Sequence, residues 1–159
     1  MLKRIIKILL VLSLFILFIP SYNKYRIEKR VDNILLSKGS SIYEGYIYIP
    51  KFNYKNVIKK GDKAINENLV SMHNLSDPIG GSNIILSGHN NKYVFHKLYN
   101  LNIGDEIILS NFKQEYIYTV DNIKIVSIDD SSTFNKEGLK LITCTNDNQK
   151  RLVVFCSKK

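Results

Sequence analysis

The sequence predicts a mostly β domain, of the sandwich or barrel kind, attached to one N-terminal membrane-spanning helix. From residue 43 onwards, short runs rich in Ile, Val and Tyr are separated by Gly, Asn and Asp, which is typical of β-sandwiches and barrels. Near the N terminus, basic residues precede a long apolar run. A chain of 159 residues with 45% hydrophobic residues is long enough for one sizeable core. We therefore expect one globular domain with one appendage.

The appendage covers residues 1–21, where Lys3, Arg4 and Lys7 precede an uncharged apolar run from Ile8 to Pro20. With the two isoleucines before Lys7, the run reaches roughly the 17 residues that a tilted helix needs to span a bilayer. A cleaved signal peptide is the alternative, but no small-x-small cleavage site follows the run. We therefore predict an uncleaved anchor, whose orientation the positive-inside rule fixes only weakly, since basic residues flank both ends.

Residues 22–40 are polar and charged, have some helical character and lead into Gly39-Ser40-Ser41. They are predicted to form a stalk between the membrane and a domain of residues 41–159. The first 30 residues contribute +6 of the formal net charge of +9, so the domain has little excess charge. Its lysines are scattered along the sequence, which argues against a nucleic-acid partner.

Six stretches of the domain are predicted strands, because they are rich in β-branched and aromatic residues and end at turn formers. In chain order they are EGYIYIP, NIILSG, DEIILS, EYIYTVDNIKIVSI, LKLITC and RLVVFC. Two further stretches, residues 60–75 and residues 90–101, have weak helical character. We expect them to be short crossover segments on the outside of the barrel.

The last two predicted strands carry both cysteines and are joined by Thr145 to Lys150, a stretch rich in turn formers, so they are expected to form a hairpin. Cys144 then lies opposite Arg151, with Cβ atoms about 5 Å apart. Cys156 lies about 17 Å further along its strand, near Leu139. A disulfide requires Cα atoms within about 7 Å, so we expect two free thiols, with Cys156 as a buried apolar filler.

A reactive thiol needs a base or an electropositive neighbour, because the thiolate is the nucleophile. His89 follows the predicted core strand NIILS and one glycine, and such a strand end suits a catalytic group. His73 and His96 lie in polar or helix-like stretches and are expected to be solvated. From the residues alone, the choice of base stays open, and so does the alternative of a packed thiol beside a surface arginine.

These motifs together resemble those of the sortases, the cysteine transpeptidases of Gram-positive bacterial surfaces. LITC, followed after six residues by RLVVFC, is similar to their TLxTC…R signature, and SGHNN is similar to their histidine motif. DPIGGSNIILSGHN resembles the stretch PGxxGNxxLxGH, and FHKLYNLNIGDEIIL resembles the run that follows it. The resemblance covers roughly Tyr43 to Phe155 in matching order. It implies a closed barrel with short helices, held by its anchor on the outer face of the cell membrane.

Carried over by position, the resemblance implies that Cys144 is the nucleophile, His89 the general acid and base, and Arg151 the group that holds the substrate backbone and the oxyanion. The implied reaction is cleavage of an LPxTG-like sorting signal through an acyl-enzyme on Cys144. Thr143 is expected to support the site by hydrogen bonding, although its β propensity alone also explains a Thr in a strand.

The partners implied are surface proteins with a C-terminal sorting signal, a peptidoglycan precursor or another amine as acceptor, and the membrane. The implied location is the cell membrane, crossed once, with the catalytic domain on the extracellular face. Three alternatives remain: a pilin-polymerising sortase, a cysteine peptidase that uses water, and an inactive barrel that acts as a binding module.

Two positions depart from the pattern of the family. Lys140 stands where the first Thr of TLxTC is usual, and Gly80-Gly81-Ser82 replaces a proline-glycine turn. Residues 128–140 are expected to wall the groove for the sorting signal. Their shortness argues against class B, and the absence of an Asp-Pro-aromatic lid before the domain argues against a pilin polymerase. No cofactor is expected, with calcium at Asp129 and Asp130 as an alternative, although adjacent loop carboxylates are usually only solvated.

Overall fold

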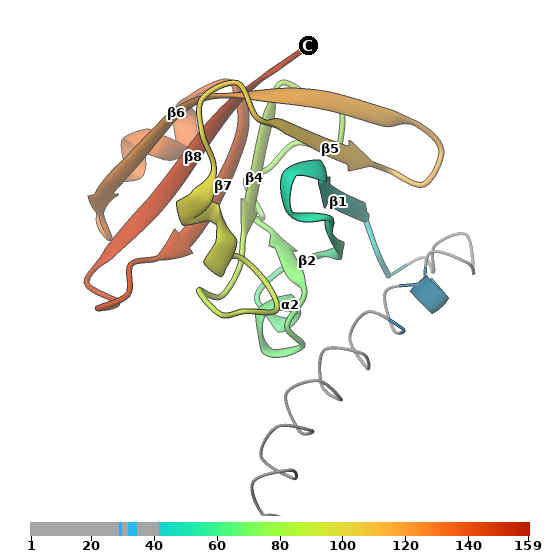
Figure 1. Ribbon diagram of the computed structural model, residues 1–159, viewed down its shortest axis with the longest axis horizontal. Coiled ribbons are helices and arrows are strands. Elements are labelled where there is room, and N and C mark those ends of the chain that lie inside the picture. The colour runs from blue at the N-terminus through green and yellow to red at the C-terminus, as the bar shows by residue number, and fades with distance from the viewer. Residues whose placement is uncertain (1–28, 30–31, 35–41) are drawn as a thin grey trace, which may run out of the picture.

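The computed structural model describes residue 29, residues 32–34 and residues 42–159. In this part of the chain, eight strands form a closed barrel in the order β1-β2-β3-β4-β7-β8-β6-β5 (Figure 1). The expected β-barrel with short helices is thereby confirmed. The predicted anchor, residues 1–21, lies outside the described residues, and within those residues no helix is long and apolar enough to cross a bilayer. Of the predicted stalk, residues 29 and 32–34 are described, and they are helical.

The described elements have the following bounds. The strands are β1 (Gly45–Ile49), β2 (Tyr54–Lys60), β3 (Val70–Met72), β4 (Asn83–Ser87), β5 (Glu106–Ser110), β6 (Glu115–Ser127), β7 (Gly138–Cys144) and β8 (Lys150–Lys158). The helices are the α-helix α2 (Lys63–Asn66) and the 3-10 helices η1 (Pro50–Phe52), η2 (His96–Asn100) and η3 (Ser131–Asn135). All six predicted strands are present, as β1 and β4 to β8.

The sequence analysis did not name β2 as a strand, and it wrongly expected helical structure where β3 forms. β3 lies inside the stretch of residues 60–75 that was expected to be helical, and only Lys63–Asn66 forms an α-helix there. Val70 pairs with Ile58 in a parallel ladder between β3 and β2, and all three β3 residues are buried. Ladder hydrogen bonds and burial therefore outweigh the weak helical preference of this stretch.

The interior of the barrel is filled by alternate residues of each strand, as the pleat of a β-strand requires. On β7, Leu139 and Leu141 belong to the large core cluster, whereas Ile142 belongs to a second cluster with Ile85 and Val153. Phe134, from the connection between β6 and β7, packs against this second cluster. The outer face of β4, β7 and β8 is therefore covered by that connection, and Cys144 lies at the end of the same face.

Candidate active site

Cys144 and Arg151 face each other across the β7–β8 hairpin. They form the last register pair of the antiparallel ladder, while Leu139 pairs with Cys156. The guanidinium Nη1 of Arg151 donates a hydrogen bond to the Sγ of Cys144 at 3.2 Å. The pairing predicted from the hairpin is thus confirmed, and it brings a permanent positive charge into contact with the thiol.

The turn of this hairpin is built by its own side chains. The backbone N–H of Thr145 donates to the carbonyl of Lys150 at 2.9 Å, and the N–H of Lys150 donates to the hydroxyl of Thr145 at 3.0 Å. Asp147 accepts from that hydroxyl and from the N–H of Gln149, and both contacts lower the pKa of its carboxyl. Asn148 takes the left-handed conformation, with φ 59°, which Asn tolerates well. These residues fix the register that sets Cys144 opposite Arg151.

His89 lies on the other side of Cys144. β4 and β7 pair in parallel, with Ser87 beside Ile142, and the contact continues past the strand end. The N–H of Gly88 donates to the carbonyl of Ile142 at 3.1 Å, and the hydroxyl of Thr143 donates to the carbonyl of Gly88 at 2.8 Å. His89 and Cys144 each lie two residues beyond Ser87 and Ile142, the last register pair of this ladder.

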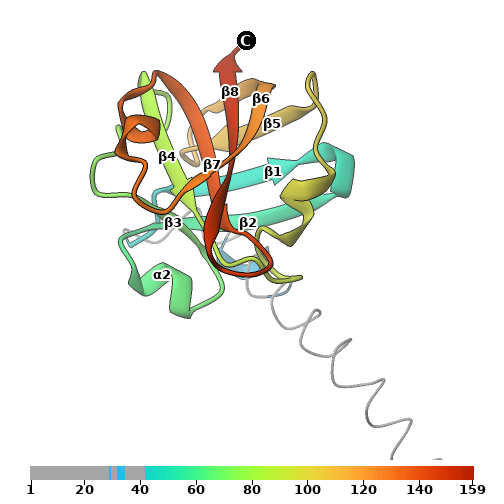
Figure 2. The same cartoon turned by 90° about the vertical axis from the view of Figure 1, so that its left-hand side faces the viewer.

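Cys144 ends β7, Arg151 lies on the neighbouring β8, and His89 lies in the loop that follows β4, the other neighbour of β7. Figure 2 shows β4, β7 and β8 side by side, with the β7–β8 turn at the end opposite the C terminus. His89 is exposed, and Cys144 and Arg151 are half-buried. The half-buried thiol of Cys144, in contact with the guanidinium of Arg151, is thus partly accessible from solvent.

The two other histidines have different partners. The Nδ1 of His96 lies 3.0 Å from the Oδ1 of Asn90 on the surface, as expected for a solvated residue. His73 is half-buried rather than solvated, because its ring stacks on Phe134 with centroids 5.1 Å apart. Its Nδ1 accepts a hydrogen bond from the N–H of Leu75 at 3.1 Å.

Two supporting residues were missed by sequence reasoning. The hydroxyl of Tyr99, on η2, donates to the carbonyl of Cys144 at 3.5 Å. The side chain of Asn90 donates to that of Asn146 at 2.9 Å and so links the loop that carries His89 to the β7–β8 turn. Only the position of Asn90 directly after the histidine could have drawn attention to it in the sequence.

Cys156 is a packing residue, as predicted. Both cysteines are free, and Cys156 is 3% exposed within the barrel core. Burial raises the pKa of its thiol, and the charge of Asp121 adds to this effect. Since the neutral thiol is favoured, Cys156 is unsuited to act as a nucleophile.

Asp130, one of the two carboxylates considered for calcium, caps η3. Its Oδ1 accepts from the N–H of Ser132 at 3.0 Å and from the hydroxyl of the same residue. These contacts lower the pKa of the Asp130 carboxyl. A calcium ion at this position would have to compete with them.

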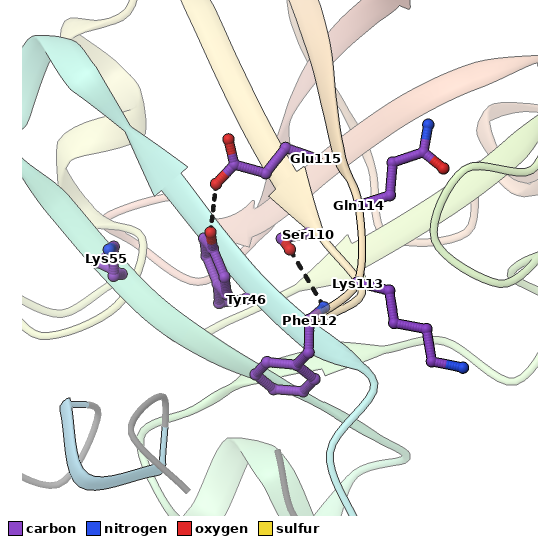
Figure 3. A pocket seen from close by; sticks show the side chains of 7 residues that line it. All are labelled: Tyr46, Lys55, Ser110, Phe112, Lys113, Gln114 and Glu115. Atoms are coloured by element: carbon purple, nitrogen blue, oxygen red, sulfur yellow. Dashed lines mark hydrogen bonds between the residues drawn. The ribbon is translucent and has the colours of Figure 1, made fainter. Parts of the chain in front are cut away.

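A separate surface hollow of about 390 Å³ lies between β1 and the β5–β6 hairpin (Figure 3). It is lined by Tyr46, Lys55, Ser110, Phe112, Lys113, Gln114 and Glu115. The hydroxyl of Tyr46 donates to Glu115 inside it. In the strand order of the closed barrel, β1 lies opposite β7, so this hollow is remote from Cys144.

Comparisons with known proteins agree on one family. Residues 47–159 match the family model described as the Sortase domain. The Bacillus subtilis (strain 168) protein named "Putative sortase YwpE" is 36% identical over 84 residues, which are 48% of this chain and 82% of that protein.

Among solved structures, sortase C1 from Streptococcus agalactiae is 32% identical with a TM-score of 0.68, covering 75% of this chain and 68% of that one. A pilus-related sortase C of Group B Streptococcus is 28% identical with a TM-score of 0.68, covering 76% and 69%. The family match spans most of the described barrel, including its Cys–Arg hairpin and its histidine loop. On this evidence the chain belongs to the sortase family of cysteine transpeptidases.

Proposed function

We propose that the chain is a membrane-anchored transpeptidase that cleaves an LPxTG-like sorting signal and transfers the surface protein to an amine of a cell-wall precursor. The observation that carries the proposal is the hydrogen bond of 3.2 Å from Arg151 to the sulfur of Cys144. It is supported by the parallel ladder of β4 and β7, whose last register pair lies two residues before both His89 and Cys144. Nucleophile, proton carrier and charged donor are the parts that acyl transfer requires.

In the first half of the reaction, the thiolate of Cys144 attacks the carbonyl carbon of the threonine in the sorting signal. The electron pair of the C=O bond moves to the oxygen, and the Arg151 guanidinium stabilises the resulting oxyanion without exchanging a proton. The oxyanion then re-forms the carbonyl and breaks the C–N bond, while His89 protonates the departing amine. The product is a thioester on Cys144.

In the second half, an acceptor amine attacks the thioester and His89 removes its proton. The tetrahedral intermediate collapses with loss of the Cys144 thiolate, which regenerates the enzyme. In both halves, the imidazole of His89 would carry the proton and the guanidinium of Arg151 would stabilise the oxyanion. Thr143 would contribute by holding the backbone just before His89, through its bond to Gly88.

Localisation is part of the proposal. The predicted anchor, residues 1–21, would hold the domain at the cell membrane with a single span, and the catalytic domain would face the extracellular side, where sorting signals are processed. Sodium carbonate extraction would leave such a chain in the membrane pellet. Protease added to intact protoplasts would digest the domain if it lies outside, and protection of the domain would refute this orientation.

A second candidate function, polymerisation of pilins, is favoured by the similarity to a pilus-related sortase C. Residues 1–42 contain no Asp-Pro-aromatic triplet, the lid that the family resemblance associates with pilin polymerases. The two functions differ in their acceptor, which is a lysine side chain in a pilin and the amine of a wall precursor in anchoring. A competition between an oligoglycine peptide and a lysine-containing pilin peptide, read by mass spectrometry of the products, separates them.

The central experiment is cleavage of a fluorogenic LPxTG-like peptide in the presence of an amine. We expect an acyl-enzyme and a transfer product with the wild-type chain, and neither with Cys144→Ala or His89→Ala. His73→Ala and His96→Ala should retain acyl-enzyme formation.

Loss of activity in folded His96→Ala would show that the wrong base was chosen. Release of hydrolysed peptide alone at saturating amine would refute the transpeptidase and favour a peptidase. Absence of any acyl-enzyme would favour a binding module.

A further inference from the structure

Lys140 is a lysine buried on the outer face of the strand that ends in Cys144. It is 0% exposed and shares its face of β7 with Ile142 and Cys144, because side chains alternate along a strand. Burying an ammonium group is costly unless acceptors surround it. The buried ammonium group of Lys140 must therefore be compensated by nearby acceptors.

Both acceptors of Lys140 tie β7 to other elements. Its Nζ donates to the Oδ1 of Asn83, at the start of β4, and to the backbone carbonyl of Lys136. The Nδ2 of Asn83 in turn donates to the carbonyl of Phe134 at 3.0 Å. Lys140 and Asn83, which contact each other, thus hold the carbonyls of Lys136 and Phe134. Both carbonyls belong to the short segment of residues 131–136.

The ring of Phe134 fixes the same segment through apolar contacts. It packs against Ile85, Ile142 and Val153 on the outer face of β4, β7 and β8. The ring of His73, which follows β3, stacks on it at an interplanar angle of 23°. Ile142 lies two residues, about 7 Å along β7, from Cys144, so the cluster that Phe134 covers extends to that distance from the reacting residue.

Within the described residues, no carboxylate accepts a hydrogen bond from the ammonium group of Lys140. Asp77 favours the charged form from a distance, but burial dominates and lowers the pKa of Lys140. The carboxylate of Asp77 accepts instead from Ser82 and from the N–H of Asn83. The amine of Lys140 therefore acts here as a hydrogen-bond donor to two uncharged oxygens.

We propose that Lys140 is a positioning residue: together with Asn83 it holds residues 131–136 against β4 and β7 as a fixed wall beside Cys144, against which the peptide substrate binds. The substrate part of this inference rests on the proposed function, whereas the holding of the segment does not. Loosening the wall should weaken substrate binding more than the chemical step, because Lys140 does not touch Cys144, His89 or Arg151.

The test compares Lys140→Met, which keeps the length of the side chain but cannot donate, with the wild-type chain. Hydrogen–deuterium exchange of the amides of residues 131–136 should accelerate about tenfold, since each lost bond to a charged donor is worth roughly a factor of ten or more. With the sorting peptide, KM should rise by a similar factor while kcat changes less than about threefold. Lys124→Met, at an exposed lysine of β6, is the matched control and should change neither quantity.

Asn83→Ala provides a second variant in case Lys140→Met does not fold, because it removes the β4 half of the same contacts. Unchanged exchange at residues 131–136 in both variants would overturn the proposal. Faster exchange with an unchanged KM would overturn the role in substrate binding. If the wild-type chain cleaves no sorting peptide, the proposed function fails, but the exchange experiment still decides whether Lys140 holds the segment.

Discussion

At the scale of single residues, the two cysteines differ because of where they lie in the barrel. Cys144 is half-buried at the open end of β7, in contact with a guanidinium. Cys156 lies in the core, where burial raises the pKa of its thiol. The first thiol is accessible to a reagent and lies beside a permanent positive charge, while the second has neither property.

We therefore expect iodoacetamide at neutral pH to modify Cys144 alone in the folded protein. Cys156 should react only after unfolding, because both its exposure and its fraction of thiolate are low. Peptide mapping by mass spectrometry, with and without denaturant, measures this, and Cys144→Ala is the control. Comparable labelling of both thiols in the folded chain would contradict the packing role of Cys156.

Arg151 offers a second test at this scale. Arg151→Ala removes the donor beside Cys144, and kcat/KM for the sorting peptide should fall by about 10² to 10³, the usual loss for an oxyanion donor. Arg151→Lys keeps the charge but not the planar fork of donors, so it should recover only part of the activity. Full activity of the Lys variant would mean that a point charge is sufficient. Thermal unfolding should show that both variants are folded.

At the scale of elements, the parallel contact between β4 and β7 decides where His89 lies. Beyond the end of β4, the hydroxyl of Thr143 holds the carbonyl of Gly88 in a buried bond of 2.8 Å. This contact joins residues that are 55 positions apart in the chain. The bond therefore fixes Gly88, directly before His89, relative to Thr143, directly before Cys144.

Thr143→Val should therefore reduce both stability and catalysis. The free energy of unfolding is expected to fall by about 1 kcal/mol, the usual value for such a hydrogen bond. In the peptide assay, kcat should fall while KM stays nearly constant, because the imidazole is misplaced but the peptide still binds. Thr143→Ser keeps the hydroxyl and should restore kcat. If the Ser variant is as impaired as the Val variant, the bond to Gly88 is not the cause.

The connection between β3 and β4 is organised by Asp77. Its carboxylate accepts from the N–H of Asn83 at 2.8 Å and from the hydroxyl of Ser82 at 3.1 Å. Within the same turn, Gly80 has φ +99°, and a Cβ there would lie 2.5 Å from the ring of Tyr116. Glycine at position 80, in the Gly-Gly-Ser sequence that replaces a proline-glycine turn, is therefore favoured by its backbone conformation and by the nearby ring of Tyr116.

The pKa of Asp77 is lowered, mainly by the bond from the backbone of Asn83, and this predicts a pH dependence. A depressed folded-state pKa stabilises the fold above the unfolded value, about 4, and that stabilisation is lost as the pH falls through the folded-state value. Asp77→Asn should thus be less stable than the wild-type chain at pH 6, with the difference shrinking towards pH 3. Urea unfolding at several pH values measures this. A difference that does not vary with pH would argue against ionised Asp77 as the source.

At the scale of the whole molecule, closure of the barrel leaves no free strand edge among the eight described strands. The buried residues of the main core lie between Ile47 and Cys156 in the sequence. Before β1, Ile34 packs against a small satellite cluster of Val57, Ala64 and Leu69. The main core is therefore built from residues of the barrel itself.

A chain of residues 42–159 should accordingly fold by itself and cleave the sorting peptide in solution. Loss of the Ile34 contact should reduce its stability only slightly, since the satellite cluster keeps Tyr43 and Phe112 as covers. Circular dichroism melting and the peptide assay check this against the full chain in detergent. A fragment without a cooperative transition would show that the N-terminal residues belong to the folding unit.

The sequence by itself determined the β-rich class, six of the eight strands and the Cys144–Arg151 pair. Strand patterns and hairpin turns depend on neighbours within a few residues, so these features can be read locally. It also gave the separation of Cys156 from Cys144, since the register of one hairpin fixes both positions. The family motifs added His89 in the matching order.

Only the tertiary structure decided the features that join distant parts of the chain. The short strand β3 exists because it pairs with β2 and is buried, in spite of its helix-like sequence. The backbone before His89 is tied to β7 because β4 pairs in parallel with β7 and Thr143 bonds to Gly88, and Lys140 reaches Asn83, 57 positions away. No local pattern records such contacts, because they arise only when the barrel closes and strands far apart in sequence become neighbours.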